Sequence, residues 1–67
     1  MSELAAWRIE DVKGQCLDFV AGTLNAIKAA QSFANARDET IFIRRVWKGI
    51  EQRRAIEPVP EAEQPIL

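Results

Sequence analysis

The 67-residue sequence predicts an all-α fold, namely an antiparallel helical hairpin followed by an extended C-terminal tail. Apolar residues recur at three- and four-residue spacing up to Ile56, as on one face of a helix. Eight of the ten alanines, the strongest helix former, lie in residues 1–36. All three prolines follow Ile56, where they forbid a continued helix. We therefore expect a helical hairpin over residues 1–56 and a tail over 57–67.

The first predicted helix covers about residues 8–35. With Ile9 at the origin of a helical wheel, an apolar stripe lies within about 60° of it. Its members are Val12, Cys16, Phe19, Val20, Leu24, Ile27, Ala30 and Ala34. Gly14 and Gly22 each cost about 1 kcal/mol relative to alanine in a helix. No other helix breaker flanks them, so we expect one continuous helix.

A strip of small residues follows one side of this helix: Gly22, Ala26, Ala29, Ala30 and Ala34. Small side chains allow the backbone of a second helix to approach closely. Alanine is also simply a good helix former, so the sequence leaves both interpretations open.

The second predicted helix covers about residues 39–54. Asn35 or Asp38 can cap its first turn, and Arg53 and Arg54 favour its C-terminal end. One face is apolar and the opposite face is basic. The apolar face holds Phe42, Ile43, Val46, Trp47 and Ile50, and the basic face holds Arg44, Arg45 and Lys48.

The tail, residues 57–67, carries three glutamates and no basic residue. Its prolines favour an extended, polyproline-like and mobile segment.

Two helices alone leave most of their apolar stripes uncovered, and a chain of this length has a marginal core. Self-association, most often as a two-fold dimer, is the simplest way to cover them. We therefore expect a homodimeric four-helix bundle. Its shape resembles small helical-hairpin dimers such as the plasmid copy-number regulator Rop, although no motif is shared. The candidates for its core and dimer contacts are Val12, Cys16, Phe19, Val20, Leu24, Ile27, Ile43, Val46, Trp47 and Ile50.

The composition argues against enzymatic chemistry. Histidine and tyrosine are absent, and Cys16 is the one cysteine, which removes internal disulfides and Cys/His zinc sites. The nearest approach to a carboxylate cluster is Glu10, Asp11 and Asp18, which fall on the solvated side of the wheel. We expect no enzyme activity, no cofactor and no metal.

The distribution of charge indicates a binding protein. The net charge of -1 gives no global attraction to nucleic acid, but residues 37–54 hold six basic and three acidic side chains. That basic face is a solvated surface, a docking site for an acidic protein or a phosphate-binding site. Leu4, Trp7 and Ile41 lie off the apolar stripes. The partner-binding candidates are therefore Leu4, Trp7, Ile41, Arg44, Arg45 and Lys48.

We predict a small non-enzymatic protein–protein interaction module, an adaptor, inhibitor or assembly partner that also forms a homodimer. The alternative is a Rop-like nucleic-acid-binding regulator that uses the basic face of the second helix. The chain opens without a secretory signal, and its longest low-charge run, residues 17–36, includes Asp18 and Lys28. With one unpaired cysteine, we expect a cytoplasmic location and no membrane partner.

Overall fold

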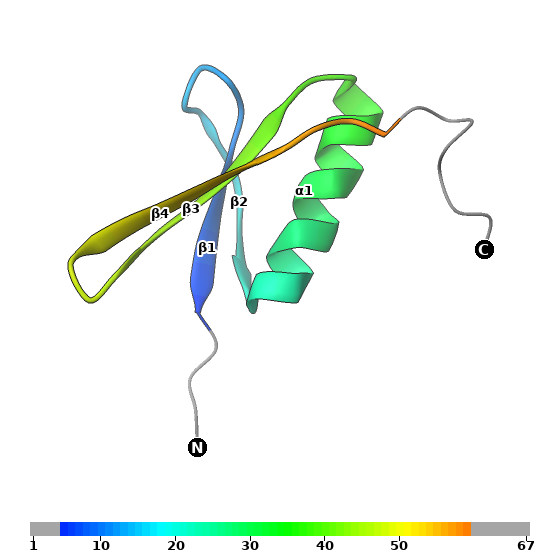
Figure 1. The fold of residues 1–67 in the computed structure, drawn as a ribbon. Coiled ribbons are helices and arrows are strands. Elements are labelled where there is room, and N and C mark those ends of the chain that lie inside the picture. Colours follow the sequence, from blue (N-terminus) through cyan, green and yellow to red (C-terminus); the bar gives the residue numbers. More distant parts are fainter. Residues whose placement is uncertain (1–4, 60–67) are drawn as a thin grey trace.

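The computed structural model describes residues 5–59 and shows one helix packed on a four-stranded antiparallel sheet (Figure 1). The elements are β1 (Ala6–Glu10), β2 (Cys16–Ala21), α1 (Thr23–Arg37), β3 (Ile41–Trp47) and β4 (Ile50–Ile56). The strands lie in the order β2-β1-β3-β4. The all-α prediction is therefore wrong, and the helical hairpin and four-helix bundle are wrong with it.

Two strands and a turn replace the first half of the predicted helix. Trp7 and Ile9 are buried on one face of β1, and Arg8 alternates with them, which is the period of a strand. The turn to β2 is held by Asp11, whose Oδ1 accepts hydrogen bonds from the backbone N–H groups of residues 13 and 15, each at 2.9 Å. Gly14 has φ +84°, which glycine adopts without strain.

Helix α1 occupies the second half of the predicted helix and starts at another glycine. Gly22 has φ +91°, and its carbonyl accepts the N–H of Ala26 at 2.9 Å. Ala26, Ala30 and Ala34 are fully buried at four-residue spacing, so one alanine face of α1 lies against the sheet. The strip of small residues thus permits a close approach, but the element it contacts is a sheet and not a second helix.

A β-hairpin replaces the second predicted helix. Ile41 and Ile43 are fully buried and alternate with the outward Phe42, and Trp47 pairs with Ile50 across a two-residue turn. The turn residues, Lys48 and Gly49, have φ +51° and +76°. Positive φ at both turn positions is the geometry that matches the twist of a two-residue hairpin.

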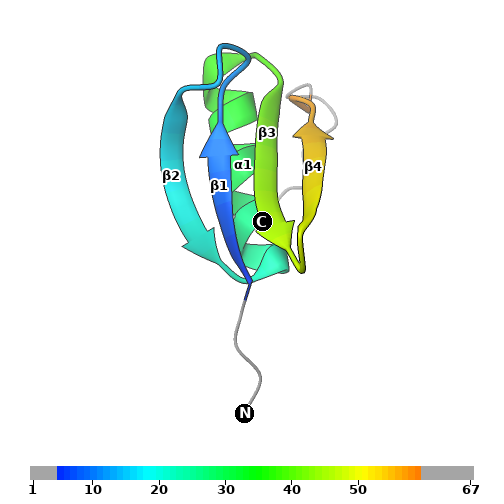
Figure 2. The ribbon, with the colours of Figure 1, turned by 90° about the vertical axis from the view of Figure 1, so that its left-hand side faces the viewer.

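The core lies in a single layer between α1 and the sheet. Its large members come from three strands, and the alanines of α1 complete it. The buried apolar residues are Trp7, Ile9, Ala26, Ala30, Ala34, Ile41, Ile43 and Ile56. Figure 2 shows the sheet in front and α1 behind it. Among the described residues, no helix covers the other side of the sheet, which we call the open face.

The chain after β4 continues past α1 and contacts it (Figure 1). The side-chain amide of Gln31 donates to the carbonyl of Glu57 at 2.8 Å, and the N–H of Val59 donates to Oδ1 of Asn35 at 2.8 Å. Residues 57 and 59 are the first part of the segment predicted to be a mobile tail, and these hydrogen bonds hold them against α1. The rest of it, residues 60–67, lies outside the described residues, as does Leu4.

Candidate functional site

The open face carries a row of three arginines that crosses the sheet. Arg8 on β1 is the register partner of Phe19 on β2 and of Arg44 on β3, and Arg44 pairs in turn with Arg53 on β4. We call Arg8, Arg44 and Arg53 the arginine row, with Phe19 at its end. Neighbouring strands lie about 4.8 Å apart, and like charges directly opposite each other are destabilising. The row is therefore stable only with compensating groups.

Two glutamates supply most of that compensation. The Glu10 side chain is only 8% exposed, and its Oε2 accepts hydrogen bonds from Nε of Arg8 and from Nη2 of Arg44, the latter at 3.2 Å. Arg44 also donates from Nη1 to Oε1 of Glu51 at 3.0 Å. The hydrogen bond to Glu51 and the charge of Glu10 raise the pKa of Arg44 above its ordinary value. These contacts fix two guanidinium groups on the open face.

The third guanidinium is held by an aromatic ring. The Cζ atom of Arg53 lies 3.9 Å from the ring centroid of Phe42, within the range of a cation–π contact. Phe42 is on the same face as the arginine row, two register pairs from the Arg44–Arg53 pair along β3 and β4. Arg53 is thus held by a cation–π contact, and no carboxylate among the described residues forms an ion pair with it.

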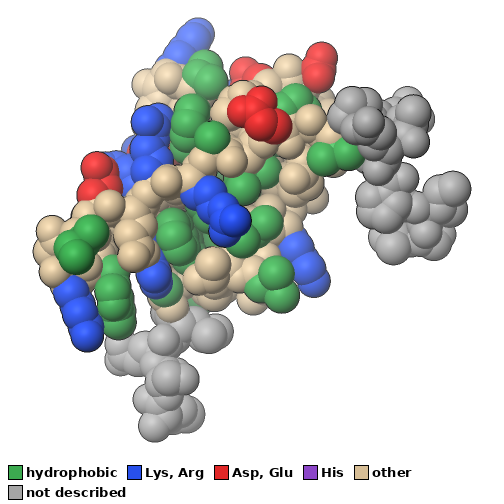
Figure 3. All heavy atoms as spheres, in the orientation of Figure 1, with side chains coloured by type: hydrophobic (Ala, Val, Ile, Leu, Met, Phe, Trp, Pro, Cys, Tyr) green, Lys and Arg blue, Asp and Glu red, His purple; other side chains and the backbone are tan. Residues whose placement is uncertain are grey.

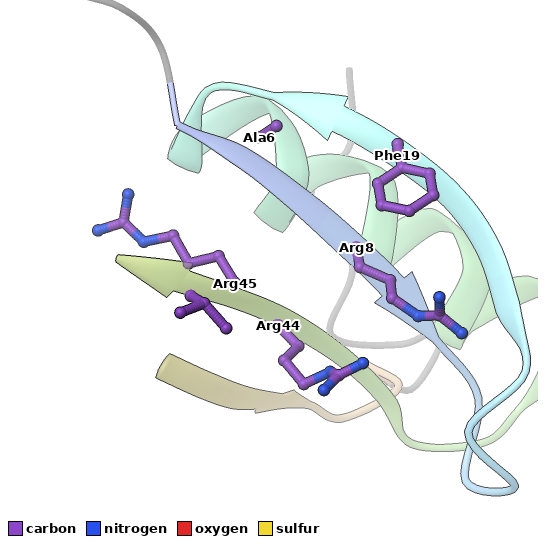
Figure 4. Close-up of a pocket in the computed structure, with 6 residues that line it drawn as sticks. Ala6, Arg8, Phe19, Arg44 and Arg45 are labelled. Carbon is purple, nitrogen blue, oxygen red and sulfur yellow. The ribbon is translucent and has the colours of Figure 1, made fainter. Parts of the chain in front are cut away.

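A shallow hollow lies beside the arginine row, with a volume of about 240 Å³. It is lined by Ala6, Arg8, Phe19, Arg44, Arg45 and Val46 (Figure 4). Phe19 and Val46 are 64% and 67% exposed, although both are large apolar side chains. In Figure 4 the Arg8 and Arg44 side chains extend side by side in one direction, whereas Arg45 points away. The hollow therefore combines an apolar surface with two fixed cations.

The predicted basic face is divided between the two sides of the sheet, because residues alternate along a strand. Arg44 lies on the open face. The Cζ atom of Arg45 lies on the α1 side, 4.6 Å from the Trp7 ring centroid and 5.5 Å from that of Trp47. Lys48 is in the hairpin turn, with Nζ 6.0 Å from the Trp47 ring. Figure 3 shows cations next to apolar side chains over this hairpin.

Two partner-binding candidates are buried and cannot form an exposed patch. Ile41 is a fully buried core residue of β3. Trp7 is 5% exposed, and its Nε1 donates to Oγ1 of Thr23 at 3.1 Å. The helical wheel places both outside the apolar stripes because it applies a helical period where the chain has the two-residue period of a strand.

The core and dimer candidates are also redistributed. Ile43 lies in the core, Val20 and Ile27 are half-buried against it, and Cys16 is half-buried. The remaining candidates are exposed at different places: Val12, Phe19, Leu24, Val46, Trp47 and Ile50. They form no common stripe, because they lie in a turn, on opposite faces of strands and on the outer side of α1.

Two buried carboxylates were not predicted from the sequence. As whole residues, Glu10 and Asp11 are only 6% and 5% exposed, although the helical wheel places both in solvent. The order Asp11-Val12-Lys13-Gly14 is a turn signal, since aspartate caps nearby backbone N–H groups and glycine adopts positive φ. That signal ends a strand at Glu10, and the alternation from Trp7 then places Glu10 on the same face as Arg8.

The described residues offer no metal-binding chemistry and no membrane span. Within residues 5–59 no group of three or more histidine, cysteine or acidic side chains could hold a metal ion. In the same range the structure has no helix whose length and apolar character would suffice to cross a bilayer. No protein-family model matches the chain, and neither curated proteins nor solved structures show a significant similarity to it.

Proposed function

We propose that this protein is a small, non-enzymatic interaction module that binds another protein through the open face of its sheet. The observation that carries the proposal is the combination of exposed Phe19 and Val46 with arginines already held in place by Glu10. Aromatic residues and arginine are enriched at protein interfaces. Side chains fixed before binding lose less conformational entropy when a partner docks.

The proposal keeps the predicted function and changes the surface. The basic face of a second helix does not exist, and the open face takes its place. A second copy of the chain docked on this face would give the predicted homodimer without any helical bundle. The free thiol of Cys16 supports a reducing, cytoplasmic location.

Photo-crosslinking tests this function directly. A benzoylphenylalanine at position 19, in the cells where the protein occurs, is expected to crosslink a defined protein partner. The matched control is the same group at Leu24, which is similarly exposed at 65% but lies on α1. The partner should then bind the purified protein and be lost with Phe19→Ser. Identical crosslinks from both positions, or none from position 19, would contradict the proposal.

Nucleic-acid binding is the second candidate, and one observation favours it. The β3–β4 hairpin concentrates five cations, Arg44, Arg45, Lys48, Arg53 and Arg54, against the single carboxylate of Glu51. Phosphate binding would appear as affinity for a single-stranded oligonucleotide that falls steeply between 50 and 200 mM salt. We place it second because the cations of the hairpin are divided between the two sides of the sheet, with Arg44 on the open face and Arg45 against Trp7 on the α1 side.

A further inference from the structure

The hollow on the open face has a chemically uneven lining. Three of its six lining residues are apolar, three are arginines, and none is acidic. At about 240 Å³ it is smaller than the roughly 300–1,000 Å³ of cofactor and drug-sized sites. The size suits one apolar side chain, and the charge suits a carboxylate beside it.

The two guanidinium groups beside the hollow keep donors for such a carboxylate. An arginine side chain has five N–H donors. Arg8 uses donors on Nε and Nη2, the latter to the carbonyl of Gly14 at 3.2 Å, and Arg44 uses one on each Nη. The remaining N–H donors of both residues can bind a ligand. The ion pairs with Glu10 and Glu51 hold the two side chains in their present orientation. Charge-assisted hydrogen bonds to carboxylates are about twice as strong as neutral ones.

We propose that the hollow binds an apolar side chain within an extended, acidic segment of a partner protein, with the flanking carboxylates on Arg8 and Arg44. This inference rests on the proposed function and specifies its ligand. The apolar side chain packs between Phe19 and Val46, which are held on β2 and β3 at either side of β1. The backbone of the bound segment lies over the open face.

The lining favours an acidic peptide over a nucleic acid. Val46 and Ala6 give the hollow aliphatic walls, which suit an aliphatic side chain better than the polar edges of a base. Glu51 is the register partner of Val46 on β4, and its carboxylate repels a continuous phosphate chain running across the sheet. A peptide with separated carboxylates avoids that repulsion.

The test measures fluorescence anisotropy with a labelled nine-residue probe in which glutamates, separated by glycines, flank one central leucine. Matched probes replace the leucine with serine or the glutamates with lysines, and a nine-nucleotide oligothymidine is the nucleic-acid probe. We expect saturable binding of the leucine probe below about 1 mM and at least about fivefold weaker binding of the serine and lysine probes.

Variants locate the binding site. Val46→Thr keeps a β-branched side chain of similar shape. We expect it to weaken the binding of the leucine probe about fivefold or more. The control is Ile50→Thr, since Ile50 is similarly exposed at 64% but lies across the turn on the α1 side. It should change affinity by less than about twofold. Thermal melts of each variant exclude unfolding as the cause.

Three results would overturn the inference: equal binding of the leucine and serine probes, equal loss with both variants, or tighter binding of the oligothymidine. Failure to bind any peptide below about 1 mM would also overturn it. The proposed function would survive that failure if the crosslink at position 19 still captured a protein, so the two proposals fail separately.

Discussion

The two faces of the sheet are built from alternate residues of the same strands, yet their compositions are opposite. On the α1 side, Ile9 and Ile43 are fully buried against the alanines of the helix. On the open face, the residues adjacent to them in the same strands are Arg8 and Arg44, which are held by ion pairs and are partly exposed. Burial of apolar area supplies stability, while exposed ion pairs supply little. One face therefore maintains the fold, and the other is the surface that we propose for binding.

The largest expected effect comes from the covered face. Ile43→Ala removes a fully buried side chain and should lower the free energy of unfolding by about 2–5 kcal/mol. For a domain this small, that loss approaches its whole stability. Urea denaturation followed by circular dichroism measures it. Val46→Ala, three residues further along β3 and on the open face, is the control and should stay within about 0.5 kcal/mol. Similar losses would mean that something covers both faces.

The contact between α1 and the sheet comes next. Ala30→Leu places a larger side chain where Ala30 is fully buried and should cost about 1–3 kcal/mol through overpacking. Ala36→Leu, on the exposed side of the same helix, is the control and should be close to neutral. An unchanged melting temperature for Ala30→Leu would show that α1 does not approach the sheet this closely.

The ion-pair network on the open face should have a smaller effect. Glu10→Gln leaves Arg8 and Arg44 without their shared carboxylate and should cost about 1 kcal/mol, because the arginines are partly exposed and solvent screens the loss. Glu51→Gln removes an exposed partner and should cost less than Glu10→Gln in the same chemical denaturation series. The reverse order would contradict the assignment of Glu10 as the group that orients the arginines.

The smallest stability change is expected at Phe19, which lies on the proposed binding surface. Phe19→Ser should shift the free energy of unfolding by no more than about 0.5 kcal/mol, since Phe19 is largely exposed on the open face. Differential scanning calorimetry measures the shift. A large destabilisation would mean that Phe19 is buried in solution, for example between two copies of the chain, and the comparison of faces would then have to include the dimer.

Part of α1 and of its packing could be predicted from the sequence, but the strands could not be recovered from a helical wheel. Residues 23–35 of α1 lie inside the predicted helix, and the small residues on one side of it do mark a close contact. Upstream, a helical period happened to collect apolar residues from two antiparallel strands and the turn between them. Gly14 and Gly22 were counted as costs within one helix, whereas their positive φ values mark two chain reversals.

The clearest sequence signal for strands that a helical wheel does not detect lies in the β3–β4 hairpin. The segment Ile41–Trp47 is rich in β-branched and aromatic residues, which favour strands, and Lys48-Gly49 follows it as a turn. The candidate site was harder to predict. Arg44 was singled out, but its neighbours Arg8 and Phe19 lie 36 and 25 residues away in the chain. Only the pairing of β1 with both β2 and β3 brings them together, and that long-range register is not contained in local periodicity.

Chemical-shift mapping tests the central claim, that the open face is the binding surface, most directly. The ¹⁵N-labelled protein is titrated with the glutamate–leucine probe while its backbone amide resonances are followed. The account predicts that the largest shifts cluster at the hollow and arginine row, namely at Ala6, Arg8, Phe19, Arg44 and Val46, with α1 nearly unchanged. Shifts centred on the outer side of α1 or on the turn at Lys48 and Gly49 would contradict it.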